Sequence, residues 1–307
     1  MYYYSLHDYA KDKFGKKLYK LALQSGCTCP NRDGKLGTAG CIFCSQGGSG
    51  EFAADGTLPV SAQIAQAKER IFSKMPRKNV GYIAYFQSFT NTYGPISRLR
   101  ALWEEAVADG DVEVLSIATR PDCLGEEVLS VLEEFNQRKP VWVELGLQTI
   151  HEETARYIRR GYELPVFDKA VKALKSRGIS VIVHVILGLP GETKEQMLET
   201  VNYVGRSGAD GIKLQLLHVL SGTDLEKEYR QGNVQVMEME EYFSLLGDCL
   251  SILPPDMVIH RLTGDGPKKL LVAPLWTANK KMVLNGFRKY GWEHSVCQGS
   301  RFGKEGE

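Results

Sequence analysis

Apolar runs of strand length alternate with amphipathic segments along the first 220 residues. "VGYIAYFQSF", which begins at Val80, and "VWVELGLQ", at 141–148, are almost continuously apolar. Between such runs, "PVFDKAVKALKSRG" places an apolar residue at every third or fourth position and ends at Gly178, a residue that favours helix termination. Short apolar strands separated by amphipathic helices are typical of a parallel sheet covered by helices.

The alternation predicts six strands with helices between them. We expect strands at 17–24, from about 80, and at 112–120, 141–148, 180–191 and 210–220, and helices at 61–75, 96–109, 125–137, 165–178 and 193–208. This pattern predicts an α/β fold, a partial (β/α)6 barrel of the TIM type with N- and C-terminal extensions, although a doubly wound sheet fits it equally well. We assign 1–16 to an N-terminal extension, 17–224 to the barrel and 225–307 to a C-terminal capping or substrate-binding segment.

Charge is unevenly distributed along the chain. The net charge is only +1, so the whole molecule makes no electrostatic case for a polyanionic partner. Residues 260–307 hold nine Lys/Arg against four acidic residues, and 11–20 form a second basic run. Either region could contact nucleic acid, but charge alone favours a solvated surface.

The chain shows neither a signal peptide nor a membrane span. Its first 17 residues lack an apolar core, and no apolar run reaches membrane-spanning length. We therefore expect a cytoplasmic protein with no membrane partner, in which thiols stay reduced. In that compartment clustered cysteines are typical of metal ligands rather than disulfides.

Four of the seven cysteines lie between residues 26 and 44. Cys41 and Cys44 form a C-x2-C turn that can direct two sulfurs at one metal centre, and a third ligand must come from Cys27 or Cys29. If both contribute, four thiolates close a tetrahedral zinc site; if one does, three thiolates hold a 4Fe-4S cluster with one open iron. Structural zinc usually stabilises small domains, and this chain is long enough for a sizeable core, which favours the cluster.

Polar and glycine-rich segments follow each predicted strand. The cysteine loop follows the first, and the later exits carry "QSFTNT", "TRPDC", "QT", "GLPGET" and "LHVLSGT". Because the carboxyl ends of parallel strands meet at one edge, we expect these segments to surround one site.

The cysteine spacing and several other blocks resemble the radical S-adenosylmethionine (SAM) superfamily. The spacing is C-x11-C-x2-C from Cys29, with Phe43 before the last cysteine. "TRPDC", "ELGLQT", "RRG" and "GLPGET" are similar to the Elongator catalytic-subunit and coproporphyrinogen-dehydrogenase branches. "CPNRDG", "YFQ" and "APLW" resemble the YhcC/YtqA type, and the resemblance covers nearly the whole chain.

The resemblance implies two cofactors, a 4Fe-4S cluster and SAM. It assigns Cys29, Cys41 and Cys44 as cluster ligands and leaves Cys27 as a spare thiol. The SAM contacts that it implies are Phe43, Gln87, Ser88, Phe89, Glu144, Gln148, Arg160 and His184.

Each SAM contact has a distinct expected partner. The backbone at 87–89 would meet the amino group, Arg160 the carboxylate, and Phe43 the adenine. Gln148 and His184 would bind the ribose. Relatives carry a glutamate where this chain has Ala118, which makes Glu144 a helper. Taken singly, each residue also has an ordinary structural explanation; a histidine in an apolar strand is often a core residue.

The implied reaction is reductive cleavage of SAM to a 5′-deoxyadenosyl radical, which takes a hydrogen atom from the substrate. The candidate catalytic residues are Tyr85, Lys213, His218 and Arg261, and further substrate-facing candidates are Gln215, Asp265 and Trp276.

The resemblance points to tRNA as the substrate. We expect conversion of a carboxymethylaminomethyl side chain on the wobble uridine to the aminomethyl form, with tRNA and an electron donor such as flavodoxin or ferredoxin as partners. The basic runs would hold the RNA backbone, and Arg261 or Lys213 would pair with the substrate carboxylate. The alternatives are a radical SAM enzyme with a small-molecule substrate and a non-catalytic, zinc-stapled RNA-binding protein.

Overall fold

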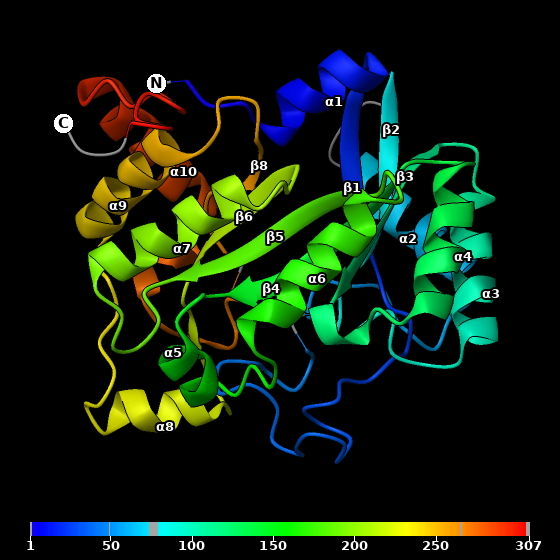
Figure 1. Ribbon diagram of the computed structural model, residues 1–307, viewed down its shortest axis with the longest axis horizontal. Helices are drawn as coiled ribbons and strands as arrows, with labels where there is room; N and C mark the ends of the chain where they lie inside the picture. Colours follow the sequence, from blue (N-terminus) through cyan, green and yellow to red (C-terminus); the bar gives the residue numbers. More distant parts are fainter. Residues whose placement is uncertain (1, 49, 74–78, 265, 305–307) are drawn as a thin grey trace.

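Seven parallel strands form an open half-barrel (Figure 1). The computed structural model describes residues 2–48, 50–73, 79–264 and 266–304. The strand order follows the chain, β1-β2-β3-β4-β5-β6-β8, and each neighbouring pair is parallel. The strands are β1 (Lys17–Leu23), β2 (Val80–Phe86), β3 (Val112–Thr119), β4 (Val141–Gln148), β5 (Ser180–Leu187), β6 (Gly211–Leu216) and β8 (Val258–Arg261).

Helices cover the outer face of the sheet, and one helix lies at the amino end of the strands (Figure 1). The connecting helices are α2 (Val60–Phe72), α3 (Ile96–Val107), α4 (Glu126–Asn136), α5 (Glu152–Tyr157), α6 (Leu164–Lys175) and α7 (Lys194–Arg206). The others are α1 (Leu6–Phe14), α8 (Asp224–Arg230), α9 (Met239–Ile252) and α10 (Lys280–Glu293), with short 3-10 turns η1 (Pro121–Cys123) and η2 (Leu275–Ala278). No helix in the described ranges is long and apolar enough to cross a membrane.

The predicted partial barrel is confirmed, and the doubly wound alternative is wrong. A doubly wound sheet reverses its strand order at a switch point, whereas this order never reverses. The bounds expected for the fourth strand agree with β4, and those for β1 and β3 are one residue too long. The expected helix 61–75 ends at Phe72, and residues 74 and 75 lie outside the described residues.

Two expected strands are shorter than predicted. β5 ends at Leu187 because the chain turns at Gly188, whose φ of +83° lies in the region that favours glycine. The apolar run 210–220 is divided between β6 and β7 (Val219–Leu220). β7 leaves the barrel and pairs antiparallel with β9 (Leu271–Ala273). Apolar content alone does not reveal this break.

A seventh barrel strand, β8, lies within the segment that we assigned to the C-terminal cap. It has only four residues and pairs with β6, so that Lys213 lies opposite Arg261. A run this short gives little period-two signal in the sequence. The C-terminal segment therefore extends the sheet as well as covering it.

Strand residues alternate between the helix-covered face and the barrel interior. In β4, Val143 and Leu145 pack in the core beneath the helices, whereas Trp142 and Glu144 face inward. Tyr9 of α1 packs edge-on against Trp142 with 5.9 Å between ring centroids, and α1 thereby closes the amino end of the barrel. Figure 1 shows α1 at one end of the strands and the loop after β1 at the other.

Truncating the core tryptophan Trp103 should strongly destabilise the fold. Trp103 has no exposed surface and packs edge-on against Phe135 at 6.0 Å, so Trp103→Ala leaves a large cavity and should cost about 3–5 kcal/mol of unfolding free energy. Trp292, which is 79% exposed, is the matched control, and Trp292→Ala should change stability by less than about 0.5 kcal/mol. Urea unfolding of both variants measures this, and equal losses would contradict the assigned core.

Candidate functional site

Three cysteines of the loop after β1 line one cavity at the carboxyl end of the sheet, which we call the central cavity. Cys29, Cys41 and Cys44 all contribute to its wall. The Cys44 N–H donates to the Cys41 carbonyl at 3.0 Å, which closes the C-x2-C turn. The Arg32 guanidinium crosses the loop and donates to the Cys44 carbonyl at 3.0 Å. The loop is thus folded so that distant parts of the sequence present sulfur to the same space.

The fourth loop cysteine, Cys27, takes a different place. It is buried, its sulfur lies beside Gly94, and it belongs to the apolar core that contains Leu21 and Val60. A four-cysteine zinc site would require Cys27 to join the other three. The described residues hold no ready-made site for a single metal ion.

The three cavity thiols are chemically suited to a bound cluster. Burial raises the pKa of the Cys41 thiol to about 12, and the neighbouring Cys44 acts in the same direction. Burial also raises the pKa of Cys44. Thiols in such a place lose their protons readily only when a cation binds them. Three thiols that line one cavity fit a 4Fe-4S cluster that keeps an open iron.

Each of the seven barrel strands contributes at least one polar side chain to the interior, and one per strand forms a layer across it. We call this set the interior belt: Lys20 (β1), Tyr85 (β2), Ser116 (β3), Glu144 (β4), His184 (β5), Lys213 (β6) and Arg261 (β8). Such inward positions usually carry apolar side chains in a filled barrel. On the amino-end side of the belt, Trp142 packs with Ile83, Val114 and Ile182. We call this cluster the apolar plug, and the belt separates it from the central cavity.

Glu144 is the centre of the interior belt. Its carboxylate has no exposed surface and accepts hydrogen bonds from Lys20 Nζ at 2.8 Å, His184 Nε2 at 2.7 Å and Ser116 Oγ at 2.9 Å. Lys213 Nζ forms a further ion pair with it. Burial alone would raise the pKa of Glu144, but the two lysines outweigh burial and hold it well below its usual range. Glu144 is therefore ionised.

Burial lowers the pKa values of two groups that contact Glu144, His184 and Lys213. Burial lowers the pKa of His184 to about 4, with Lys213 acting in the same direction, so the imidazole is neutral at pH 7. A neutral ring that donates from Nε2 has Nδ1 as an acceptor, and the Gln215 amide lies 3.5 Å from it. Burial also lowers the pKa of Lys213, although its ion pair with Glu144 opposes this.

Tyr85 lies between two ammonium groups. Lys213 Nζ is 3.1 Å from its hydroxyl and 4.5 Å from the ring centroid, and Lys20 Nζ is 4.6 Å from the same centroid. Burial raises the pKa of Tyr85 well above 10, and Glu144 adds to the effect. The phenol therefore stays protonated, and Tyr85 lines the central cavity.

Most of the predicted SAM contacts line the central cavity. They are Phe43, Gln87, Phe89, Glu144, Gln148, Arg160 and His184. Ser88 is the exception: it is buried behind the wall, and its hydroxyl lies against Gly50. Phe89 and Gln148 adopt positive φ values of 59° and 66°, which side chains seldom do. Such strained residues commonly cluster at functional sites.

Arg160 is already engaged by its own surroundings. Its buried guanidinium donates to the carbonyls of Thr149 at 2.6 Å and Tyr162 at 2.9 Å, and pairs with Glu152 at 3.0 Å. Its assignment to the SAM carboxylate stays a prediction.

The predicted substrate-facing residues are only partly together. His218 and Arg261 line the central cavity, and the His218 ring lies against Gly264 and Gly266. Lys213 reaches the site through Tyr85 and Glu144 rather than through the cavity wall. Trp276 donates to the Met237 carbonyl at 3.1 Å, outside the cavity wall. Asp265 lies outside the described residues.

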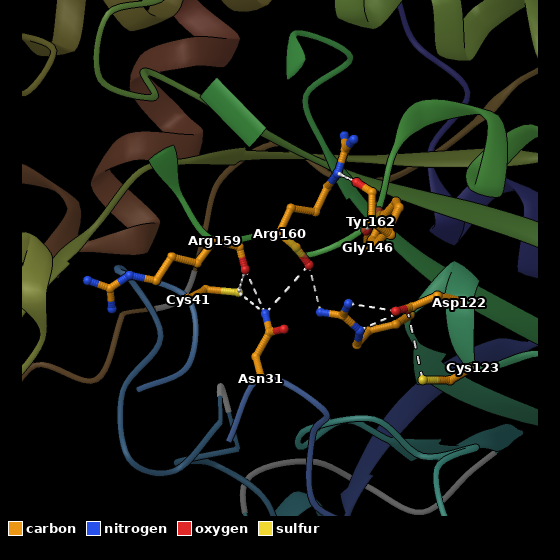
Figure 2. A network of polar contacts seen from close by, with 9 residues as sticks. Asn31, Cys41, Asp122, Cys123, Gly146, Arg159, Arg160 and Tyr162 are labelled. Atoms are coloured by element: carbon orange, nitrogen blue, oxygen red, sulfur yellow. Dashed lines mark hydrogen bonds and ion pairs between the residues drawn. The ribbon is translucent and has the colours of Figure 1, made fainter. Parts of the chain in front are cut away.

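Several site residues escaped the sequence reasoning. Arg120 pairs with Asp122 at 2.8 and 2.9 Å and donates to the Arg160 carbonyl at 2.8 Å, which joins the exit of β3 to the turn after α5. Figure 2 labels Asp122 and Arg160, the two partners. Lys20 looked like one of many surface lysines of a basic run, yet it faces inward. A single lysine flanked by apolar residues in a strand was the available signal.

Comparisons with known proteins agree with this geometry. The radical SAM superfamily model matches residues 28–204, and the radical SAM C-terminal domain model matches residues 209–292. YtqA of Bacillus subtilis is 43% identical over 300 residues, covering 98% of this chain and 92% of that protein. YhcC of Escherichia coli K12 is 35% identical over 293 residues, covering 95% and 93%.

Two archaeal proteins are more distant. The tRNA uridine(34) acetyltransferase of Methanocaldococcus jannaschii is 28% identical over 181 residues, covering 58% of this chain and 33% of that protein. The structure of Methanocaldococcus infernus Elp3 superposes with a TM-score of 0.68 at 19% identity, covering 92% of this chain and 64% of that one. It confirms the fold. With family models spanning most of its length, the chain belongs to the radical SAM superfamily.

Proposed function

We propose that this radical SAM enzyme acts on the wobble uridine of tRNA and converts its carboxymethylaminomethyl side chain to the aminomethyl form. The observation that carries the enzyme class is the set of three cysteines sharing one cavity with the interior belt. The substrate is supported by the partial match to a protein named tRNA uridine(34) acetyltransferase and by the basic C-terminal surface described below. A cytoplasmic location goes with this substrate.

The cofactors would be held by residues of the cavity wall. Cys29, Cys41 and Cys44 would ligate the 4Fe-4S cluster. The SAM contacts would be Phe43, Gln87, Ser88, Phe89, Glu144, Gln148, Arg160 and His184. Bound together, the cofactors supply a two-electron oxidation, in which the side chain, water and SAM give the aminomethyl group, glyoxylate, methionine, 5′-deoxyadenosine and a proton. This balance consumes no net electron, so a reductant is needed only to bring the cluster to its active reduced state, and flavodoxin or ferredoxin is our proposed donor.

The interior belt would bind the substrate side chain. Arg261 lies on the cavity wall, and its guanidinium suits a carboxylate. Lys20 and Lys213 share one carboxylate, Glu144, so this part of the belt carries a surplus of positive charge that favours an anionic group. The substrate carboxylate would thus be drawn towards β6 and β8.

Tyr85 of the belt and His218 of the cavity wall would take part in proton transfer. Tyr85, protonated and held by Lys213, would present a fixed donor to the substrate. His218, packed against Gly264 and Gly266, would be placed to accept the proton that the attacking water loses when the carbon–nitrogen bond is hydrolysed.

The tRNA would dock on the C-terminal surface. Residues 266–292 contain six Lys/Arg and no acidic residue, and they start at the cavity wall with Gly266 and Pro267. On α10, Lys281, Lys289 and Trp292 are exposed and recur at helical spacing on one face. Such a face offers positive charge to phosphates and an aromatic ring to a base.

Cys27→Ser and Cys29→Ser should separate the two assignments of the cysteine loop. After anaerobic reconstitution with reductant and SAM, wild type and Cys27→Ser should form 5′-deoxyadenosine, whereas Cys29→Ser should lose it by at least about a hundredfold because a ligand is missing. Iron content is measured alongside. Zinc bound through all four cysteines, with no 5′-deoxyadenosine from wild type, would sink the catalytic proposal and favour the RNA-binding alternative.

Deleting the gene should change one modified nucleoside. We expect the carboxymethylaminomethyl wobble uridine to accumulate and the aminomethyl form and its derivatives to disappear, as measured by mass spectrometry of digested tRNA. Purified enzyme should release glyoxylate and 5′-deoxyadenosine in equal amounts from such tRNA. An unchanged wobble-uridine profile, with 5′-deoxyadenosine still formed in vitro, would instead favour a small-molecule substrate.

Reversing charge on α10 should weaken tRNA binding. The double variant Lys281→Glu, Lys289→Glu removes up to two phosphate contacts, so the slope of log affinity against log salt should become shallower by about 2. The control is Lys169→Glu, Lys172→Glu, the same charge change at two exposed lysines of α6. Equal losses of affinity in the two variants would contradict α10 as the docking face.

A further inference from the structure

The Asn31 side chain lies beside one of the cluster ligands. Asn31 is 5% exposed and sits in the loop between Cys29 and Cys41. Its amide nitrogen is 2.6 Å from the Arg159 carbonyl, 3.4 Å from Cys41 Sγ and 3.5 Å from the Arg160 carbonyl (Figure 2). An amide nitrogen has two N–H donors. The shortest bond takes one of them, and the other has the Cys41 sulfur and the Arg160 carbonyl within reach.

The surroundings fix Asn31 in this orientation. Its own carbonyl accepts from the Gly40 N–H at 2.8 Å, which ties its backbone to the residue before Cys41. A Cβ at Gly161 would lie 2.8 Å from Asn31 Oδ1 and 3.3 Å from Arg120 Nη2. Gly161 has a φ of +82°, so both the turn and the space for Asn31 call for glycine. The backbone of Asn31 is thus tied to the residue before Cys41, and glycine at position 161 leaves room for its side-chain oxygen.

Ligation of the cluster by Cys41 would strengthen the contact. As a thiol, Cys41 can donate to the Arg159 carbonyl, from which its sulfur lies 3.6 Å away. As a cluster ligand it is a thiolate and can only accept, so that carbonyl is left to Asn31. An N–H directed at an anionic sulfur is a charge-assisted hydrogen bond. Asn31 would therefore serve the metal-bound state better than the empty one.

We propose that Asn31 is a positioning residue that raises the reduction potential of the cluster through an N–H···S hydrogen bond to Cys41. The inference rests on the proposed function in one respect, the assignment of Cys41 as a ligand. Reduction adds negative charge to the cluster and its sulfurs, and a hydrogen bond to sulfur stabilises that charge. The residue thus makes the cluster easier to reduce, which is the step that the electron donor must drive.

The test is the midpoint potential of the reconstituted cluster, measured by a redox titration followed by electron paramagnetic resonance, without SAM or tRNA. Asn31→Leu keeps the size of the side chain and removes both donors. At a fixed solution potential its ratio of reduced to oxidised cluster should fall about tenfold, which corresponds to about 59 mV for one electron. Asn31→Asp, which also adds negative charge, should shift at least as far.

Asn91 supplies a matched control. It is a fully buried asparagine that anchors the start of the same loop, accepting from Ser25 Oγ at 2.6 Å and donating to the Phe86 and Ala118 carbonyls. Asn91→Leu should lower stability and leave the potential of any cluster it holds unchanged. A wild-type potential in Asn31→Leu with full iron content, or an equal shift in Asn91→Leu, would overturn the proposal.

A measurement on the wild type covers the case in which the variants fail to bind iron. In protein labelled with 15N-asparagine, pulsed resonance of the reduced cluster should detect a nearby 15N nucleus, and its absence would overturn the hydrogen bond. Failure of the proposed function is seen separately. A wild type that holds zinc instead of iron sinks both ideas, whereas a cluster without tRNA activity leaves the Asn31 result standing.

Discussion

The buried carboxylate of Glu144 is the interaction on which the barrel interior depends. Burying an ionised carboxylate costs several kcal/mol unless good partners compensate it. Here four strands supply the partners: Lys20 from β1, Ser116 from β3, His184 from β5 and Lys213 from β6. Removing one member of a buried pair typically costs about 3–5 kcal/mol. The strands around β4 must therefore keep the register that brings these groups together.

This constraint also decides where the site lies. The belt occupies the layer between an apolar plug, in which Tyr9 packs on Trp142, and the central cavity. On the carboxyl-end side of the belt, the cavity wall carries both polar and apolar side chains and the sheet is open, so the interior at that level is left for ligands. The charged groups stand on strands rather than on loops, which keeps their positions well defined. The cysteines are on a loop, and their position depends on hydrogen bonds such as those from Arg32 to the Cys44 carbonyl and from Asn31 to the Arg159 carbonyl.

The sequence predicts those parts of the structure that leave a regular pattern in it, either an apolar period or a fixed spacing between residues of one type. The strand-helix alternation predicted the half-barrel. The cysteine spacing left Cys27 and Cys29 as alternatives, and the family resemblance implied the three thiols, Cys29, Cys41 and Cys44, that line one cavity. β8 was missed because four residues show no clear period. Lys20 was missed because a lysine in a basic run looks solvated; only the pairing of β1 with β2 places it inside.

Side-chain orientation is the other kind of information that the sequence did not carry. Ser88 and Phe89 are consecutive, yet Phe89 lines the cavity and Ser88 lies behind its wall. Arg160 was assigned from its distance in sequence to Gln148, but its guanidinium already serves three acceptors of its own chain. Such choices depend on long-range packing, which a local pattern does not encode.

The turn after α5 joins the parts of the site that the sequence keeps apart. Asn31 of the cysteine loop and Arg120 of the β3 exit both end on carbonyls of residues 159–160 (Figure 2). The side chain of Arg160 continues from the same turn to the Thr149 carbonyl beyond β4. Main-chain carbonyls hold this junction, and Gly161 leaves the space that it needs. The cysteine loop is therefore positioned by the barrel through a glycine turn, and a displacement of that turn would move the sulfur ligands and the cavity wall together.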